Sequence, residues 1–450
     1  MNKYIFKLTI VIILFTGCED FLENPPAVGL SNDKLVDIPS MEALIYGAYG
    51  QVRGYIAQYS LYSTAMVRDI NIRNRAEYEQ FYDHLLSTNM TSWVYNSSYN
   101  ALGLINTVAV SDVENMEGTD EEKSAILGDM HFLRAMIYFE LNNYFTLPST
   151  GYSVPLVKEP IGVNDRVSTS TSENIKNSVE EDIEKARQYF DVQPGVANYY
   201  AATALAARIY FYHEKYQLAY ERANEVITEG NFIIENNVAD AFVPGKNSRE
   251  NIFSFVFNSA DGIGTSPTQN LFVSYQADDS RGWYSLNLDG ELAQLMLADT
   301  TDARYSAFFT ETEAHTYING KYSTDQMDFH YIRLPEMYLI RAEANIRTKN
   351  NVSQQDVDDI NILKERSNPS TFLNSIPSAE EMLDIIFAER TKELAIELGD
   401  HFLNVRRLEK PIIEKEEEGG GLKPFNEYNN LLVFPFPESE VEIHGLTRER

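Results

Sequence analysis

Residues 198–230 read NYYAATALAARIYFYHEKYQLAYERANEVITEG, with small and aromatic side chains recurring at helical spacing. Ala207 and Tyr210 lie three apart in the first half, and Ala219 and Ala223 lie four apart in the second. Residues at these separations share one face of an α-helix. Because alanine lets facing helices approach closely, the stretch predicts an antiparallel helix pair.

The positions of these residues match a tetratricopeptide unit, a helix pair of about 34 residues. A second, weaker candidate pair comprises RLPEMYLIRAEANIRTK at 333–349 and the residues from Val357 to Arg366. Fewer than three repeats do not make a self-supporting solenoid, so other helices must cover them. Amphipathic stripes predict such helices from residue 41, over 93–110 and 132–144, and from 172 onward, where Thr171 or Ser172 would cap the N-terminus.

The middle of the chain, residues 231–330, differs from the helical regions in its sequence pattern. It contains short β-like pieces, IFSFVFN at 252–258 and LFVSYQ at 271–276, separated by turns rich in Gly, Ser, Asp and Asn. We interpret it as a loop-rich insertion on a helical scaffold, where binding residues are commonly carried. The predicted fold class is therefore mainly α with a few short strands.

The only cysteine, Cys18, follows the leader MNKYIFKLTIVIILFTG at 1–17. Lys3 and Lys7 give a positive n-region, and the apolar run at 8–15 is shorter than the roughly 20 residues of a membrane-spanning helix. The leader predicts export, and the small residues before Cys18 predict a lipoprotein signal that leaves this cysteine to carry acyl chains. The alternative is an ordinary signal peptide with an incidental cysteine.

Composition narrows the class of partner. The 450 residues carry a formal net charge of −30, which argues against nucleic acid and against anionic surfaces. Neutral ligands such as sugars or peptides are compatible with it, as is a merely solvated acidic surface. A single cysteine excludes a disulfide within the chain.

Several motifs, in this order, resemble the SusD/RagB family of outer-membrane lipoproteins from Bacteroidetes over essentially the whole chain. They are CEDFLENPP at 18–26, the aromatic helix around Trp93, HFLRAMIYFELNNYF…VPLV at 131–157, DRVSTSTSENIKNSVEEDIEKA at 165–186, the tetratricopeptide unit near 207, RLPEMYLIRAEA at 333–344, AERTKELAIELGDHFLNVRRLEK at 388–410 and LLVFPFPESEVE at 431–442.

The resemblance implies a tetratricopeptide-containing α-helical superhelix with an irregular ligand-binding region. It also implies a surface-exposed, lipid-anchored outer-membrane protein that covers a SusC-like TonB-dependent transporter as a lid. Members bind and hand over oligosaccharides, or peptides in some cases, and do not cleave them. A peptide-binding RagB-like lid is the first alternative. An envelope enzyme and a purely structural tetratricopeptide scaffold are further alternatives.

The resemblance and the composition shifts together suggest five segments. These are a signal peptide at 1–17, a lipidated tether at 18–38, an N-terminal helical region with tetratricopeptide units at 39–230, the insertion at 231–330 and a C-terminal RagB/SusD region at 331–450.

Sugar recognition needs flat apolar faces for pyranose rings and polar groups for hydroxyls. Two segments combine them, RDINIRNRAEYEQFY at 68–82 and YQADDSRGWY at 275–284. The candidates are Arg73, Asn74, Arg75, Tyr78 and Tyr82 in the first, and Tyr275, Asp278, Asp279, Arg281, Trp283 and Tyr284 in the second. Trp283 is the strongest because it lies among polar residues rather than on an apolar stripe. The alternative is a ring packed under its own loop.

Other aromatic positions favour packing. Trp93 is expected in the core, with Asn96 one turn along as a weak ligand candidate. The spacing of Tyr55, Tyr59 and Tyr62 aligns them on one helix face, which again predicts packing.

Glu389, Glu393 and Glu397 are four apart, so they would form one ridge on a helix among basic residues. This predicts a structural ion-pair lattice rather than two carboxylates that face each other across a cleft. The sequence has no HExxH motif and no cysteine ligands, and a calcium site at Asp278 and Asp279 would be weak. We therefore expect no catalytic metal and no cofactor.

Overall fold

The computed structural model describes residues 37–446 except 163, 193–194, 257–268 and 415–419. The predicted leader, Cys18 and most of the tether lie outside the described residues, so lipidation stays a prediction. Helix dominates the described chain, which confirms the mainly α fold class. Within the described ranges, none of the helices combines the length and the apolar character that crossing a membrane requires.

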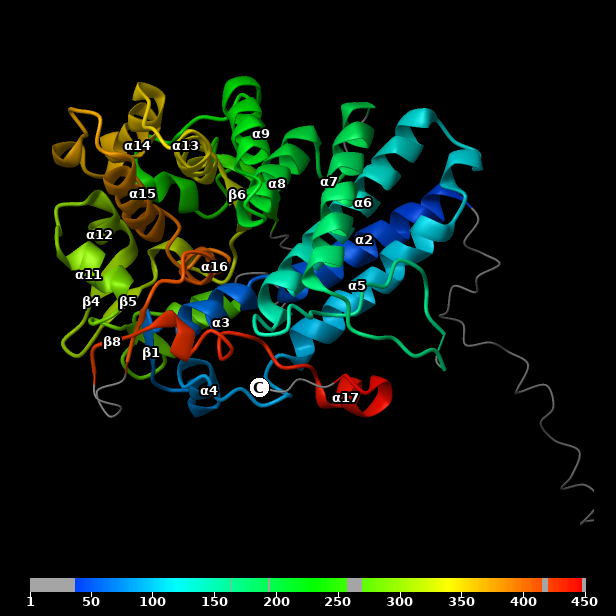
Figure 1. Ribbon diagram of the computed structural model, residues 1–450, viewed down its shortest axis with the longest axis horizontal. Coiled ribbons are helices and arrows are strands. Elements are labelled where there is room, and N and C mark those ends of the chain that lie inside the picture. Colours follow the sequence, from blue (N-terminus) through cyan, green and yellow to red (C-terminus); the bar gives the residue numbers. More distant parts are fainter. Residues whose placement is uncertain (1–36, 163, 193–194, 257–268, 415–419, 447–450) are drawn as a thin grey trace, which may run out of the picture.

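Successive helix pairs form the scaffold, and they lie side by side in Figure 1. The pairs are α2 (Ile38–Tyr55) with α5 (Ser92–Val110), α6 (Asp120–Phe145) with α7 (Ser172–Val192), α8 (Tyr199–Tyr212) with α9 (Tyr216–Glu229), and α13 (Leu334–Lys349) with α14 (Gln354–Ser367). Helix α5 also packs on α6, α7 on α8, and α9 on α13, which links the pairs into one continuous stack.

The predicted repeat unit is confirmed as the α8–α9 pair. Ala207, Ala219 and Ala223 are fully buried between the helices, as close approach requires. The Asn198 side chain caps α8 by accepting from the amide of Ala201 at 2.9 Å. At α7 the predicted cap is confirmed, because Thr171 Oγ1 accepts from the amide of Asn174 at 3.3 Å.

Short elements fill the rest of the described chain. The helices are α3 (Gln58–Met66), α4 (Glu79–Tyr82), α10 (Gln269–Tyr275), α11 (Glu291–Leu297), α12 (Ala303–Phe308), α15 (Ala379–Glu393), α16 (Asp400–Arg407) and α17 (Glu438–His444). The strands form two-stranded antiparallel sheets, β1 (Ile70–Ile72) with β3 (Tyr284–Leu286), β2 (Asn251–Phe255) with β6 (Phe329–Arg333), β4 (Phe309–Glu311) with β5 (Thr316–Ile318), and β7 (Ile412–Ile413) with β8 (Leu422–Lys423).

The insertion region differs in detail from its prediction. The piece at 252–258 overlaps strand β2, as expected, but the piece predicted as a strand at 271–276 is largely helix α10. Short apolar runs do not distinguish the two structures, and the side chain of Leu271 is buried in either case. Strand β1 comes from the predicted helical region 39–230 and β3 from the predicted insertion, so the two segments share one sheet.

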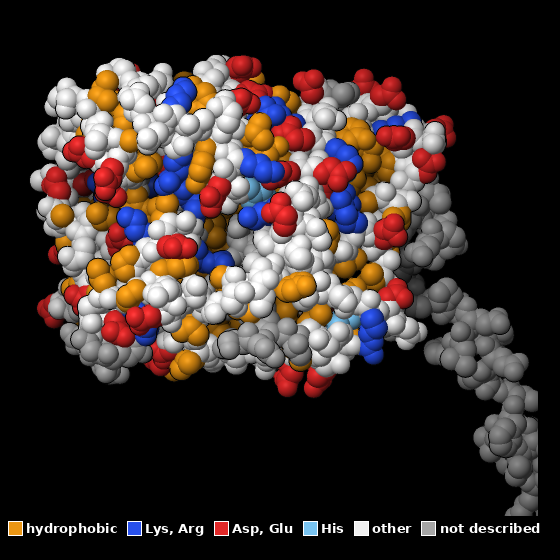
Figure 2. All heavy atoms as spheres, viewed as in Figure 1, with side chains coloured by type: hydrophobic (Ala, Val, Ile, Leu, Met, Phe, Trp, Pro, Cys, Tyr) orange, Lys and Arg blue, Asp and Glu red, His pale blue; other side chains and the backbone are white. Residues whose placement is uncertain are grey.

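Two hydrophobic clusters stabilise the fold. The larger one extends through the N-terminal helices, the insertion and the C-terminal strands, while the smaller one lies between α13, α14 and α15. Burial of Tyr55, Tyr59 and Tyr62 is confirmed, since all three are at most 5% exposed. Their placement on one helix face is wrong, because Tyr55 ends α2 whereas Tyr59 and Tyr62 lie on α3. On the face shown in Figure 2, acidic and basic side chains are interspersed, and hydrophobic side chains form only scattered patches.

Candidate functional site

The two candidate segments meet in space, although about 200 residues separate them in the chain. Strand β1 of the first pairs antiparallel with β3 of the second, with Ile72 opposite Tyr284 and Ile70 opposite Leu286. The ladder continues beyond the strands, because the amide of Arg73 donates to the carbonyl of Trp283 at 2.7 Å. The structure therefore places the two candidate segments side by side.

A tight loop presents Trp283. The Asn74 side-chain amide donates to the carbonyl of Gly282 at 2.7 Å, which fixes the loop against the first segment. A Cβ atom at position 282 would lie 2.2 Å from the carbonyl oxygen of Gln276, so only glycine fits there.

The indole of Trp283 is partly buried among residues of the first segment. The Tyr78 ring stacks on it at a centroid distance of 5.7 Å and an interplanar angle of 25°. The guanidinium carbon of Arg75 lies 4.1 Å from the indole centroid. We call Arg73, Asn74, Arg75, Tyr78 and Trp283 the Trp283 patch.

Tyr275 and Tyr284 require a correction, because they do not face solvent. Tyr275 is 1% exposed and Tyr284 is 0% exposed, and their rings meet edge to face at 5.7 Å beneath the patch. Burial raises the pKa of both hydroxyls above that of a free tyrosine. These residues support the patch from below and offer no open face on which a sugar could stack.

Asp279 organises the polar side of the site. Its Oδ1 accepts hydrogen bonds from the Tyr317 hydroxyl at 2.8 Å and from the Thr312 hydroxyl at 3.0 Å, with His315 Nδ1 also at 3.0 Å. The same oxygen lies 3.6 Å from a guanidinium nitrogen of Arg73, which also donates to the Tyr317 hydroxyl. Sequence reasoning missed the three partners on the β4–β5 hairpin, since nothing in their local pattern indicates this contact.

The remaining candidate residues of the two segments lie toward the edges of the Trp283 patch. Arg281 has a side chain 77% exposed and a loose ion pair with Asp278 at 3.8 Å. Hydrogen bonds from Ser280 lower the pKa of Asp278. Tyr82 lies at the opposite end of the ladder from Trp283, where the guanidinium of Arg68 covers its ring at 5.2 Å.

Trp93 was predicted to be in the core, and this is wrong. Its side chain lies in the first turn of α5 and is 47% exposed, while Val94 and Tyr95 are the residues of that turn that face the core. Asn96, one turn along the helix, is also exposed. Trp93 and Asn96 therefore form a second surface aromatic and amide pair.

The glutamate ridge is a buried ion-pair network, as predicted. Glu389 contacts Arg304 at 2.7 Å, Glu393 contacts Arg333 at 3.3 Å, and Glu397 contacts Arg333 at 2.7 Å. One detail differs, because α15 ends at Glu393 and Glu397 joins from the following turn. These five residues, which we call the buried ion-pair network, have side chains at most 9% exposed.

Burial opposes ionisation of these carboxylates, but their cationic neighbours outweigh it. Arg304 is the main neighbour that lowers the pKa of Glu389 to about 2, and Arg333 does the same for Glu397. Both groups therefore stay ionised at neutral pH and are fully paired.

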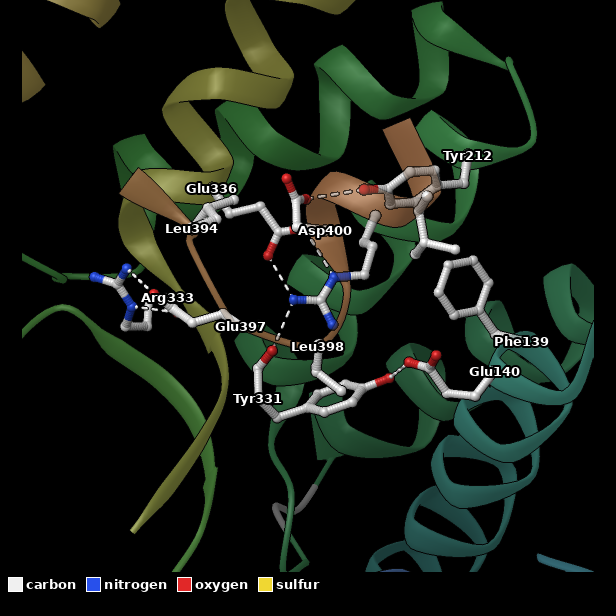
Figure 3. A pocket seen from close by; sticks show the side chains of 12 residues that line it. Phe139, Glu140, Tyr212, Tyr331, Arg333, Glu336, Leu394, Glu397, Leu398 and Asp400 are labelled. Carbon is white, nitrogen blue, oxygen red and sulfur yellow. Dashed lines mark hydrogen bonds and ion pairs between the residues drawn. The ribbon is translucent and has the colours of Figure 1, made fainter. Parts of the chain in front are cut away.

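A small cavity of about 20 Å³ lies beside this network (Figure 3). In the close-up, the Tyr331 hydroxyl points at the Glu140 carboxylate, to which it donates at 2.8 Å, and the Tyr212 hydroxyl points at Asp400. The cavity has room for about one water molecule and none for a sugar. Burial raises the pKa of Glu140 to about 7.

Over the residues that the structure describes, no group of three or more His, Cys, Asp or Glu side chains is arranged to hold a metal ion.

Two family models match this chain without overlapping. Residues 20–211 match a family described as "Starch-binding associating with outer membrane", and residues 298–432 match the SusD family. A SusD-like protein, P25, from Formosa agariphila is 25% identical over 270 residues. That match covers 52% of this chain and 48% of the relative, so it spans about half the length of each.

Solved structures share the fold over nearly the whole chain. A SusD superfamily protein from Bacteroides thetaiotaomicron has a TM-score of 0.77 at 20% identity, with 91% of this chain and 98% of that chain covered. A laminarin-binding SusD-like protein has a TM-score of 0.72 at 16% identity, with the same coverage. At these identities, the likeness shows a common architecture.

Proposed function

Because this chain belongs to the SusD family, we propose that it is a surface-exposed outer-membrane lipoprotein that binds an oligosaccharide. It passes the ligand to a SusC-like TonB-dependent transporter without cleaving it. Cys18 carries the lipid anchor, so the chain reaches the membrane through acyl chains only. The family description of outer-membrane association and the laminarin-binding neighbour support this proposal.

The observation that carries the proposal is the Trp283 patch. Strand pairing places an aromatic pair, Tyr78 and Trp283, at the surface next to the amide of Asn74 and the guanidinium groups of Arg73 and Arg75. Aromatic faces pack against the apolar CH surface of a pyranose, and amide and guanidinium groups hydrogen-bond to its hydroxyls. Carbohydrate binding needs both kinds of group together.

Several contacts hold the site rigid before a ligand binds, which favours carbohydrate binding. Arg73 and Asp279 lock each other through Tyr317, and Gly282 and Asn74 fix the loop, so little ordering is needed when a ligand arrives. Trp93 and Asn96 provide a second exposed position at which a longer oligosaccharide could be held.

The test is a binding screen with the full chain in detergent against a panel of glycans that includes laminarin, and against peptides. We expect one glycan class to bind, and Trp283→Ala to weaken it at least about five-fold, in keeping with the loss of roughly 1 kcal/mol of stacking. Tyr152→Ala is the matched control, since this tyrosine is 52% exposed and lies in the segment between α6 and α7. Binding of peptides and not of glycans would contradict the proposal and favour the RagB-like alternative.

A further inference from the structure

The two neighbours of the Trp283 indole differ in their surroundings. Tyr78 stacks on the indole and also contacts Phe81 at 6.2 Å and Tyr284 at 6.2 Å, both of them fully buried. Tyr78 is therefore held against the core. The side chain of Arg75 is 44% exposed, so solvent reaches the guanidinium that lies over the indole.

Arg75 and Arg73 are held very differently. The side chain of Arg73 is 16% exposed and is bound to Asp279 and Tyr317. The guanidinium of Arg75 is paired with Glu77 at 3.0 Å, and the Glu77 side chain is itself 52% exposed. Exposed ion pairs and exposed cation–π contacts are both weak, so little free energy holds Arg75 over the ring.

We propose that Arg75 is a movable cover on the ligand-binding face of Trp283. In the free protein its guanidinium occupies one face of the indole, and a neutral sugar ring displaces it when it stacks there. Glu77 is two residues away, so it keeps the displaced guanidinium beside the site. This inference rests on the proposed function, because it concerns the same site.

The cover lowers affinity, since each binding event must break the contact between Arg75 and Trp283. The loss of an exposed cation–π contact corresponds to about two- to five-fold in the dissociation constant. Removal of the Arg75 side chain should therefore strengthen the binding of a neutral glycan, which is the opposite of the effect expected for a residue that holds the ligand.

The first arm of the test measures the cover directly and needs no ligand. Trp93→Phe leaves Trp283 as the only tryptophan, so its fluorescence reports this site alone. In that background, Arg75→Ala should raise quenching by neutral acrylamide roughly two-fold, because one ring face is uncovered. Arg281→Ala is the matched control, because it removes an exposed arginine from the loop that carries Trp283. It should leave the quenching of Trp283 unchanged. Equal quenching with and without Arg75 would overturn the proposal.

The second arm measures laminarin binding by the full chain with an otherwise native sequence. We expect Arg75→Ala to bind about two- to five-fold more tightly than the wild type. Weaker binding would overturn the proposal and make Arg75 a direct ligand contact. If Trp283→Ala binds laminarin as well as the wild type does, the proposed site is wrong, while the quenching arm still decides whether Arg75 covers the ring.

Discussion

The buried ion-pair network and the Trp283 patch are built from the same kinds of residue. Both combine arginines with carboxylates, and aromatic rings lie over arginines in or beside each of them. In the network, Arg304 has a side chain 0% exposed and Glu389 one 1% exposed. In the patch, the side chain of Arg75 is 44% exposed and that of its partner Glu77 is 52% exposed.

The two regions therefore differ in how far solvent reaches their charged side chains. A buried charge must be fully paired, so the network is committed to structure and has nothing to offer a ligand. At Arg75 and Glu77 in the patch, water can replace the ion pair at little cost, which leaves a guanidinium group and a ring face available for recognition. A cluster of arginines, acids and aromatics in a sequence does not by itself distinguish these two uses.

The largest expected effect comes from breaking the network. Arg304→Met would leave Glu389 and Asp302 buried without their main cation, which should cost about 3–5 kcal/mol of unfolding free energy. Urea denaturation measures this effect, and Arg75→Met is the exposed counterpart, for which we expect less than about 1 kcal/mol. Equal losses for the two variants would contradict the comparison.

The next effect is on pH dependence and concerns Glu140. Its pKa is about 7 in the folded state and close to 4.5 in the unfolded chain, so the folded state binds the proton more tightly. Stability should fall as pH rises through this window, by about 2.5 kcal/mol between pH 5 and pH 8.

Glu140→Gln removes the titration and keeps an acceptor for the Tyr331 hydroxyl. Its unfolding free energy, measured at four pH values, should therefore vary less with pH than that of the wild type. Asp129, with a pKa raised to about 6 by burial, contributes a slope of the same sign in both proteins. Identical slopes would show that Glu140 does not titrate in this window.

A smaller effect is expected at Gly282, where the patch meets its supporting loop. Gly282→Ala places a methyl group against the carbonyl of Gln276, which should cost about 1–3 kcal/mol and weaken glycan binding by displacing Trp283. The control is Gly54→Ala, at a helical position with no atom within 4 Å of the added carbon. For that control we expect unchanged or slightly higher stability on thermal unfolding and unchanged binding.

The smallest effect on stability is expected at Arg281. Its side chain is 77% exposed and its ion pair with Asp278 spans 3.8 Å, so Arg281→Ala should change the unfolding free energy by less than about 0.5 kcal/mol. A loss comparable to that of Arg304→Met would mean that exposure does not separate the two regions.

Local pattern predicted the scaffold and much less of the site. The alanines of 198–230 and the buried stripe of Ile175 and Val179 repeat at helical spacing, so the helices follow from the sequence. Pairing of β1 with β3 joins residues about 200 positions apart, and such contacts leave no trace in a local pattern. The same holds for Tyr317, which reaches Asp279 from another hairpin.

The wrong predictions of side-chain burial also have physical causes. Trp93 lies next to core residues in the chain, but its position in the first turn of α5 turns it outward. Tyr275 and Tyr284 belong to a polar segment, yet both are buried, because one ends a helix and the other sits on a paired strand. Composition of a segment does not determine the direction of each side chain within it.

The most direct test of the account asks which tryptophan responds to a bound glycan. The full chain with Trp93→Phe reports on Trp283, and the chain with Trp283→Phe reports on Trp93. Both are titrated with the glycan that the wild type binds in the screen, beginning with laminarin. We predict a saturable change in the emission of Trp283. Its midpoint should match the dissociation constant of the wild type for the same glycan, measured by isothermal titration calorimetry. A silent Trp283 together with a saturable change at Trp93 would place the ligand on α5 and contradict the account.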